Sequence, residues 1–167
     1  LRAERRGRSG RERLAMATKR LRLGLQVWSQ YVTWQELMAI GREIDELGFD
    51  ELWSNDHLFP QAAGGVGALG ELDGPVFEGW SILFGWAGVT SQARMGCLVS
   101  GAGYRNPGLL VKMATALDHA TGGRAALGLG AGWFEREHQA FGFEFPPVGQ
   151  RLDRMGEAAA IIRGLLD

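Results

Sequence analysis

The feature that most constrains the fold is an alternation of short apolar runs of strand length with longer stretches of helical periodicity. Four apolar runs are each followed by a helical pattern, and the pairs cover residues 21–28 with 33–47, 49–54 with 76–89, 94–100 with 107–120, and 124–129 with 151–166. Repeated strand and helix units of this kind predict a parallel sheet with right-handed crossovers. The sequence therefore predicts an α/β fold, either an open doubly wound sheet or part of an eight-stranded barrel.

Local signals mark the ends of the first and third predicted helices. Thr33 and Glu36 have the spacing of a capping box at a helix start. Gly48 stands where a glycine commonly follows the last turn of a helix. Pro107 occupies a helix-opening position. These signals agree with the periodicity and support the order of units.

Composition indicates one globular domain with a sizeable core. The chain has 167 residues, of which 46% are apolar and 22% charged. No apolar stretch approaches the roughly 20 residues of a membrane-spanning helix, so we expect no membrane partner and a cytoplasmic location. Cys97 is the single cysteine and the three histidines are scattered, which predicts neither an internal disulfide nor a metal site.

Residues 1–20 are predicted to form a disordered basic arm. They carry eight Lys and Arg residues against two Glu residues and have little apolar content before Leu14. A nucleic-acid-binding tail is the alternative, but the arm contains no aromatic residue and the rest of the chain is acidic. We therefore expect no nucleic-acid partner and assign the folded unit to residues 21–167.

A glycine-rich loop follows the second predicted strand, over residues 55–74. Within it, Gly65, Gly67 and Gly70 match the dinucleotide pattern G-x-G-x-x-G. That pattern needs to run directly from a strand into a helix, whereas here Pro60 and a polar stretch intervene. We interpret the loop as a mobile lid over the mouth of a barrel or as disordered chain, not as a nicotinamide site.

Four segments resemble a known family. They read LRLGLQVW, ELGFDELWSNDHLFP, YRNPGLLVKMATALDHATGGRAALGLGAGWFEREHQAFGFEFPP and RLDRMGEAAAIIRGLLD. In this order they resemble successive segments of the luciferase-like monooxygenase family, over residues 21–167. The resemblance implies a TIM (β/α)8 barrel, of which this chain supplies the first four β/α units, and a flavin or deazaflavin cofactor.

Two short motifs favour a subgroup of that family. The motifs Ser-Asn-Asp-His-Leu at 54–58 and Gly-Ala-Gly-Trp at 130–133 resemble those of enzymes that use the deazaflavin coenzyme F420. The resemblance implies an oxidoreductase that transfers hydride between F420 and a small organic substrate. The alternative is an FMN-dependent monooxygenase that inserts one oxygen atom. Ala131 stands about where some sugar-phosphate-oxidising members have a glutamate, which argues against that substrate class.

His57 and Asp56 are the candidate catalytic residues. They end the second predicted strand, and ligands of parallel α/β folds bind at the carboxyl ends of strands. A histidine beside a carboxylate can move a proton near neutral pH. The resemblance likewise implies a histidine near the reactive edge of the ring with the preceding acid in the same site. The alternative is a loop histidine that caps the chain.

The candidate cofactor-binding residues lie at the ends of three predicted strands: Trp28, Leu98, Val99, Ser100, Gly130, Ala131 and Gly132. The resemblance implies that residues 98–101 bend, often through a non-prolyl cis peptide, into a shelf under the flavin ring; an ordinary strand end is the alternative. Glycines at alternate positions in 128–132 let a planar ring approach the backbone, or merely fit a crowded interior. Trp28 lines the ring pocket or packs in the core.

The loop after the fourth predicted strand contains two further polar side chains of interest. We interpret Glu137 and His138 as helix and loop scaffolding and not as catalysts.

The number of units raises a question about activity. A complete barrel takes about 250 residues and eight strands, so four units make about half of one, without the usual phosphate site after strands seven and eight. Four parallel strands would leave an unpaired edge and apolar surface. We expect a fragment with weak or no activity, a complementing half barrel, or a homodimer; a non-catalytic assembly module is the second alternative function.

Overall fold

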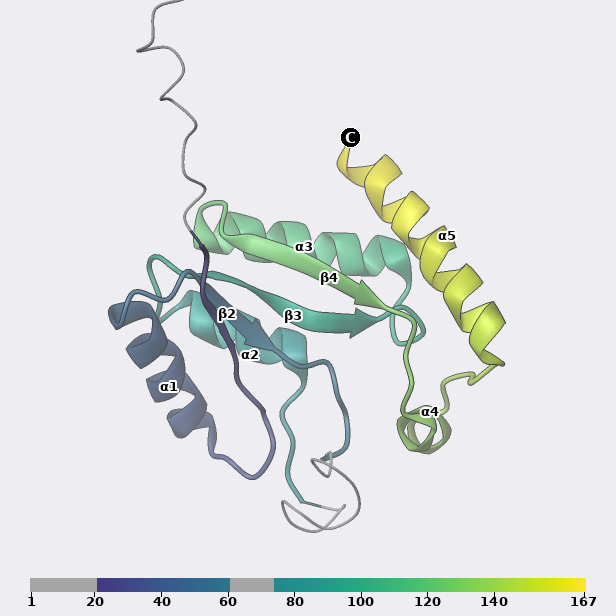
Figure 1. Ribbon diagram of the computed structural model, residues 1–167, viewed down its shortest axis with the longest axis horizontal. Helices are drawn as coiled ribbons and strands as arrows, with labels where there is room; N and C mark the ends of the chain where they lie inside the picture. Colours follow the sequence, from purple (N-terminus) through teal and green to yellow (C-terminus); the bar gives the residue numbers. More distant parts are fainter. Residues whose placement is uncertain (1–20, 61–73) are drawn as a thin grey trace, which may run out of the picture.

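The computed structural model describes residues 21–60 and 74–167, whose strands form one parallel sheet in the order β1-β2-β3-β4 (Figure 1). The strands are β1 (Gly24–Gln26), β2 (Glu51–Ser54), β3 (Arg94–Gly101) and β4 (Ala125–Gly130). The helices are α1 (Trp34–Glu46), α2 (Gly79–Ala87), α3 (Pro107–Thr121), α4 (Glu135–Phe141) and α5 (Val148–Leu166). The predicted α/β fold of four parallel strand and helix units is confirmed.

Two predicted segments fall outside the described residues. One is the basic arm at 1–20. The other is most of the glycine-rich loop, at 61–73, with Gly65, Gly67 and Gly70.

The predicted boundaries are too wide at the first strand and miss one helix. β1 keeps only three residues because it is an edge strand paired with the short β2, and Leu21 and Leu23 remain exposed. α2 begins at Gly79, later than predicted, because the Glu78 side chain accepts a hydrogen bond from Ser81 N and caps the helix there. The predicted loop after β4 contains the short helix α4.

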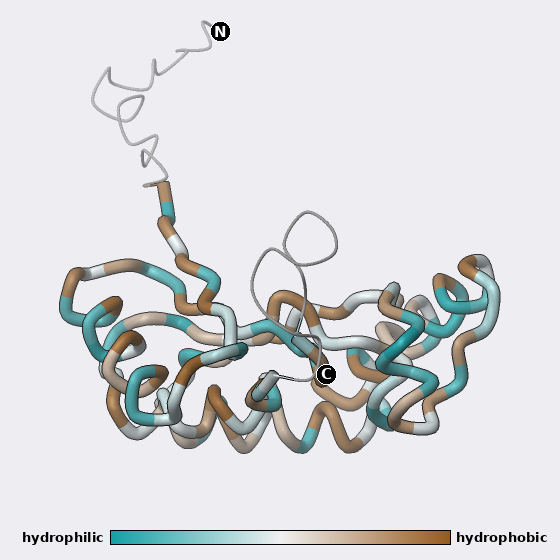
Figure 2. Tube along the Cα trace, turned by 90° about the horizontal axis from the view of Figure 1, so that it is seen from below, coloured by the Kyte–Doolittle hydropathy of each residue, from teal (hydrophilic) through white to brown (hydrophobic). Residues whose placement is uncertain are grey.

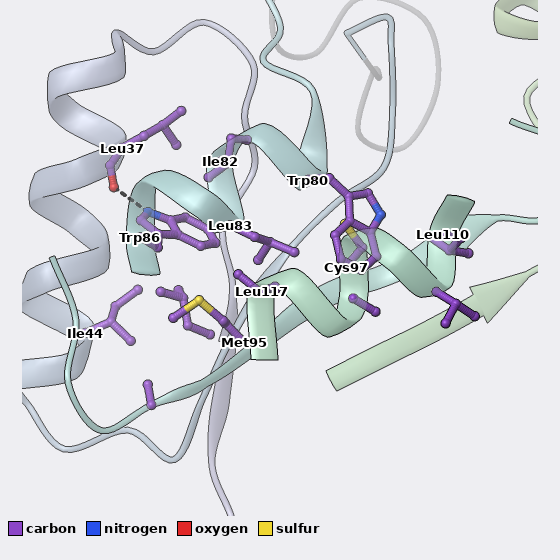
Figure 3. Close-up of a cluster of buried hydrophobic side chains, with 14 of the residues drawn as sticks. Leu37, Ile44, Trp80, Ile82, Leu83, Trp86, Met95, Cys97, Leu110 and Leu117 are labelled. Atoms are coloured by element: carbon purple, nitrogen blue, oxygen red, sulfur yellow. Dashed lines mark hydrogen bonds between the residues drawn. The ribbon is translucent and has the colours of Figure 1, made fainter. Parts of the chain in front are cut away.

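The hydrophobic core lies between the sheet and helices α1, α2 and α3 (Figure 3). Trp86 of α2 is fully buried, and its indole N–H donates to the Leu37 carbonyl of α1 at 2.8 Å. Gly41 makes this packing possible, because a Cβ there would lie 2.3 Å from the Trp86 ring. Hydrophobic and hydrophilic segments alternate along the chain trace (Figure 2), as expected for helices with one face on a core.

Asp45 of α1 ties that helix to the start of β3. Its buried carboxylate accepts hydrogen bonds from the backbone N–H groups of Ser91, Gln92 and Ala93 at 2.6–2.9 Å, and from the Ser91 hydroxyl. Burial acts to raise the pKa of Asp45, but these hydrogen bonds outweigh it, and the pKa lies below the ordinary value of 3.8.

We expect Asp45→Asn to lower the free energy of unfolding by about 1–3 kcal/mol at neutral pH, because an amide nitrogen replaces an acceptor oxygen among buried N–H donors. Since the folded-state pKa is lowered, the ionised carboxylate stabilises the protein above pH 3.8, and this stability is lost as the pH falls through the folded-state value. The difference between wild type and variant in urea unfolding should therefore shrink in acid. Asp153→Asn, at an exposed position of α5, is the control; an equal loss there would contradict the assignment.

Within the described parts of the chain, no helix is both long and apolar enough to cross a membrane.

Candidate functional site

A pocket of about 150 Å³ opens at the carboxyl ends of β2, β3 and β4. The loop after β2 supplies Asp56 and His57, and the end of β3 with the loop after it supplies Leu98, Val99, Gly101 and Tyr104. The end of β4 and the chain after it supply Gly130, Gly132 and Trp133. Six of the nine candidate residues from the sequence therefore line one pocket. Its place is where parallel α/β folds bind ligands.

Leu98 and Val99 form an apolar wall of this pocket. The pairing of β3 with β4 shifts register between Cys97 and Ser100, and both intervening side chains are 40% or more exposed. An irregularity of this kind redirects side chains relative to a regular strand. The peptide bond between Leu98 and Val99 is cis, as the resemblance led us to expect. The Gln26 side chain donates to the Leu98 carbonyl at 3.0 Å and holds this bend from β1.

The glycines of β4 accommodate the bend in β3. A Cβ at Gly130 would lie 2.5 Å from the Val99 side chain, and one at Gly128 would lie 2.7 Å from the Cys97 carbonyl oxygen. The sequence left two interpretations of these glycines open, and these short distances show that they fit a crowded interior. The same arrangement leaves the Gly130 backbone on the pocket wall.

His57 is held by a carboxylate distant in sequence. Its Nδ1 lies 3.0 Å from both carboxylate oxygens of Glu137 in α4, and the Glu137 side chain is fully buried. The His57 ring also meets the Trp133 ring edge to face, with centroids 5.7 Å apart. The interpretation of Glu137 as general scaffolding is therefore incomplete, because this residue contacts the candidate catalytic side chain.

Glu137 accepts three further hydrogen bonds. The backbone N–H groups of Leu58 and Phe59 donate to Oε1 at 2.7 and 3.0 Å, and the Tyr104 hydroxyl donates to Oε2 at 2.6 Å. Burial acts to raise the pKa of Glu137, but the hydrogen bonds from His57 and Tyr104 outweigh it and the pKa is lowered. Burial and the bond to Glu137 raise the pKa of Tyr104, so its hydroxyl keeps its proton.

Asp56 has a different partner from the one that the sequence suggested. Its carboxylate accepts two hydrogen bonds from Arg105, at 2.6 and 2.8 Å, and one from the Gly101 N–H. Arg105 also donates to Glu78, the residue that caps α2. Burial raises the pKa of Asp56 and Arg105 opposes that effect. Asp56 thus lines the pocket as part of an ion cluster, whereas the carboxylate bonded to His57 Nδ1 is Glu137.

Three predicted site residues lie outside the pocket lining. Ser100 is fully buried, and its hydroxyl accepts a hydrogen bond from the Trp80 indole at 2.9 Å. Ala131 is half-buried between two lining glycines. Trp28, just beyond β1, is 36% exposed.

The candidate residues from the sequence did not include Tyr104, Arg105 and Trp133, and they included Gly101 only as the end of the bend at 98–101. A signal for Tyr104 and Arg105 was available, since they follow β3 at the same sheet edge as His57. In the described residues, no group of three or more His, Cys, Asp or Glu side chains is placed to hold a metal ion.

Fold and site together define an α/β chain with a pocket at the carboxyl edge of a parallel sheet. The family profile described as luciferase-like monooxygenase matches residues 21–167. The chain belongs to the luciferase-like monooxygenase family, and its four units correspond to part of that family's barrel.

Two relatives and one solved structure illustrate the likeness. The chain is 36% identical over 131 residues to a phthiodiolone/phenolphthiodiolone dimycocerosates ketoreductase of Mycobacterium tuberculosis, covering 71% of this chain and 33% of that protein. It is 30% identical over 154 residues to an F420-dependent glucose-6-phosphate dehydrogenase of Microbacterium testaceum, covering 87% and 41%. An F420-dependent secondary alcohol dehydrogenase, solved with an F420-acetone adduct, superposes with a TM-score of 0.72 at 20% identity, covering 85% and 41%. The chain thus spans between a third and about two fifths of these proteins.

Proposed function

We propose that this chain forms part of the active site of an F420-dependent oxidoreductase, at the carboxyl ends of its parallel strands. Such an enzyme transfers hydride between the deazaflavin and a small organic substrate. The observation that carries the proposal is one pocket with an apolar wall, Leu98 and Val99, and a histidine held by a buried carboxylate, His57 with Glu137. Sequence similarity to an F420-dependent dehydrogenase supports the choice of coenzyme.

The pocket fits part of a planar ring system. Its wall of exposed aliphatic side chains and bare glycine backbone offers an apolar surface, and His57 adds a polar group beside it. None of the described residues that line it is Lys or Arg, so the phosphate groups of a coenzyme would be held elsewhere. At about 150 Å³ the pocket would take a ring edge and not a whole coenzyme.

The residues of this chain would divide the work of the reaction. Leu98, Val99 and Gly130 would hold the ring, and the deazaflavin supplies the carbon that gives or takes the hydride when it is bound. His57 would hold or move the proton that accompanies the hydride at the substrate, because an imidazole works as acid or base near neutral pH. Asp56, bonded to Arg105 and to the Gly101 N–H, would hold the end of β3 in place beside the pocket.

A fluorescence titration with F420 and separately with FMN, beside a sizing column, tests the cofactor assignment. We expect saturable binding of F420, and we expect Val99→Asp to weaken it about tenfold or more, because a carboxylate would replace apolar surface under the ring. Leu109→Asp is the matched control, since it adds the same charge at an exposed position in the first turn of α3, where an acidic residue is tolerated. Equal affinity of Val99→Asp and wild type would contradict the proposed wall.

The second candidate is an FMN-dependent monooxygenase, which the description of the family as monooxygenases favours. Saturable binding of FMN with none of F420 would select it. Binding of neither, with a homodimer or a complex with a complementing half barrel on the column, would select a non-catalytic assembly module.

A further inference from the structure

Glu137 is the most heavily bonded carboxylate around the pocket. The side chain is fully buried, although its neighbours in α4, Glu135 and Arg136, are exposed. It gathers the His57 ring, the backbone N–H groups of the two residues after His57, and the Tyr104 hydroxyl. All four donors belong to segments that line or border the pocket.

The protonation state of Glu137 fixes the proton on the His57 ring. Hydrogen bonds that lower the pKa of Glu137 keep it ionised near neutral pH, and an ionised carboxylate can only accept hydrogen bonds. Its contact with Nδ1 therefore requires a proton on Nδ1. In a neutral imidazole the other nitrogen, Nε2, then carries the lone pair.

We propose that Glu137 is a positioning residue that fixes the tautomer and orientation of His57, so that proton transfer in the pocket takes place at Nε2. This inference rests on the proposed role of His57 in moving a proton. Glu137 acts on His57 twice, through the ring at Nδ1 and through the backbone of Leu58 and Phe59.

The arrangement differs from that of a carboxylate with a purely structural role. Asp45 is also buried and also accepts backbone N–H groups, but its partners are backbone and a serine hydroxyl. Both oxygens of Glu137 instead contact the titratable ring of His57, which borders the pocket. A residue needed only to anchor the loop would not require a charge there, because the oxygen of a neutral amide could accept from Leu58 and Phe59.

Glu137→Gln separates the two roles. If the new amide oxygen accepts from the Leu58 and Phe59 N–H groups, the amide nitrogen takes the place of Oε2 and faces His57 and Tyr104 as a donor. The anchor of the loop is then kept, whereas one of the two acceptors that face Nδ1 becomes a donor, which weakens the preference for a proton on Nδ1. Glu135→Gln is the matched control, since Glu135 is an exposed residue of the same helix that bonds only to Gln139 among the described residues.

The test is ¹⁵N NMR of the histidine rings in the full chain, with the pH raised until the ring signals no longer change. We expect the His57 signal of wild type and of Glu135→Gln to show the proton on Nδ1, and that of Glu137→Gln to show a mixture or the Nε2-protonated form. Tyr104→Phe, which leaves the carboxylate in place, should keep the proton on Nδ1. An Nε2 proton in wild type, or an unchanged tautomer in folded Glu137→Gln, would overturn the proposal.

Activity supplies the second readout. In the assembly that shows turnover, Glu137→Gln should lower turnover at least about tenfold, the usual scale when the group that orients a functional imidazole is lost, with coenzyme affinity within about twofold of wild type. The NMR result needs neither coenzyme nor substrate, so it tests the tautomer even if F420 does not bind. A shifted tautomer with unchanged turnover in Glu137→Gln would overturn the positioning role. Failure of the wild-type chain to bind F420 would overturn the proposed function alone.

Discussion

Replacing His57 by alanine is expected to lower turnover by roughly 10²- to 10⁴-fold, the range that general acid or base catalysis contributes. The reason is geometric, since His57 borders the pocket and is bonded to a buried carboxylate. Coenzyme affinity should change little, because the apolar wall of Leu98 and Val99 remains. Steady-state kinetics of the assembly that shows turnover, together with the fluorescence titration, separate the two effects.

The control for this experiment is His119→Ala, at an exposed position in the last turn of α3. It removes an imidazole of the same size without touching the pocket, so turnover should stay within about twofold of wild type. If His57→Ala retained the turnover of the control, His57 would have no part in proton transfer. A loss of coenzyme binding in step with turnover would instead make it a binding residue.

The second large effect is expected on stability, from Arg105→Met. The Asp56 side chain is fully buried, and Arg105 satisfies both of its oxygens. Removing one partner of a buried ion pair leaves an uncompensated charge, which costs about 3–5 kcal/mol. Asp56 lines the pocket and also accepts a hydrogen bond from the Gly101 N–H. Arg105→Met should therefore weaken ligand binding as well as lower the free energy of unfolding.

The pH dependence of that loss has a definite sign. The folded-state pKa of Asp56 is raised above 3.8 by burial, so its contribution is most favourable below that value and becomes less favourable as pH rises through the folded-state pKa. Without Arg105, the loss of stability that accompanies ionisation of Asp56 becomes larger. The difference in free energy of unfolding between variant and wild type, measured in urea, should therefore be larger at pH 7 than near pH 4. A loss that did not depend on pH would contradict the role of Asp56 charge.

Arg154→Met is the matched control, because it breaks an ion pair with Glu144 in which both side chains are largely exposed. Pairs of this kind contribute less than about 1 kcal/mol. Equal losses of unfolding free energy in the two variants would show that burial of the Arg105 cluster is not what makes it stabilising.

The sequence by itself determined the units of the fold and the place of the site. Periodicity located the strand and helix pairs, the capping box of Thr33 and Glu36 is present, and Gly48 after α1 has a positive φ. These features depend on a few neighbouring residues, so propensity and capping reveal them. The rule that ligands bind at the carboxyl ends of parallel strands then placed His57, Leu98 and Gly130 in one region.

Tertiary structure alone decided which groups meet. Glu137 lies 80 residues from His57 in the chain, and its position on a short helix gives no local sign of its partner. Likewise, the adjacency of Asp56 to His57 suggested a pair, but Asp56 bonds to Arg105, 49 residues on, and His57 bonds to Glu137. The order of β2, β3 and β4 and the docking of α4 bring these groups together, and neither depends on local sequence.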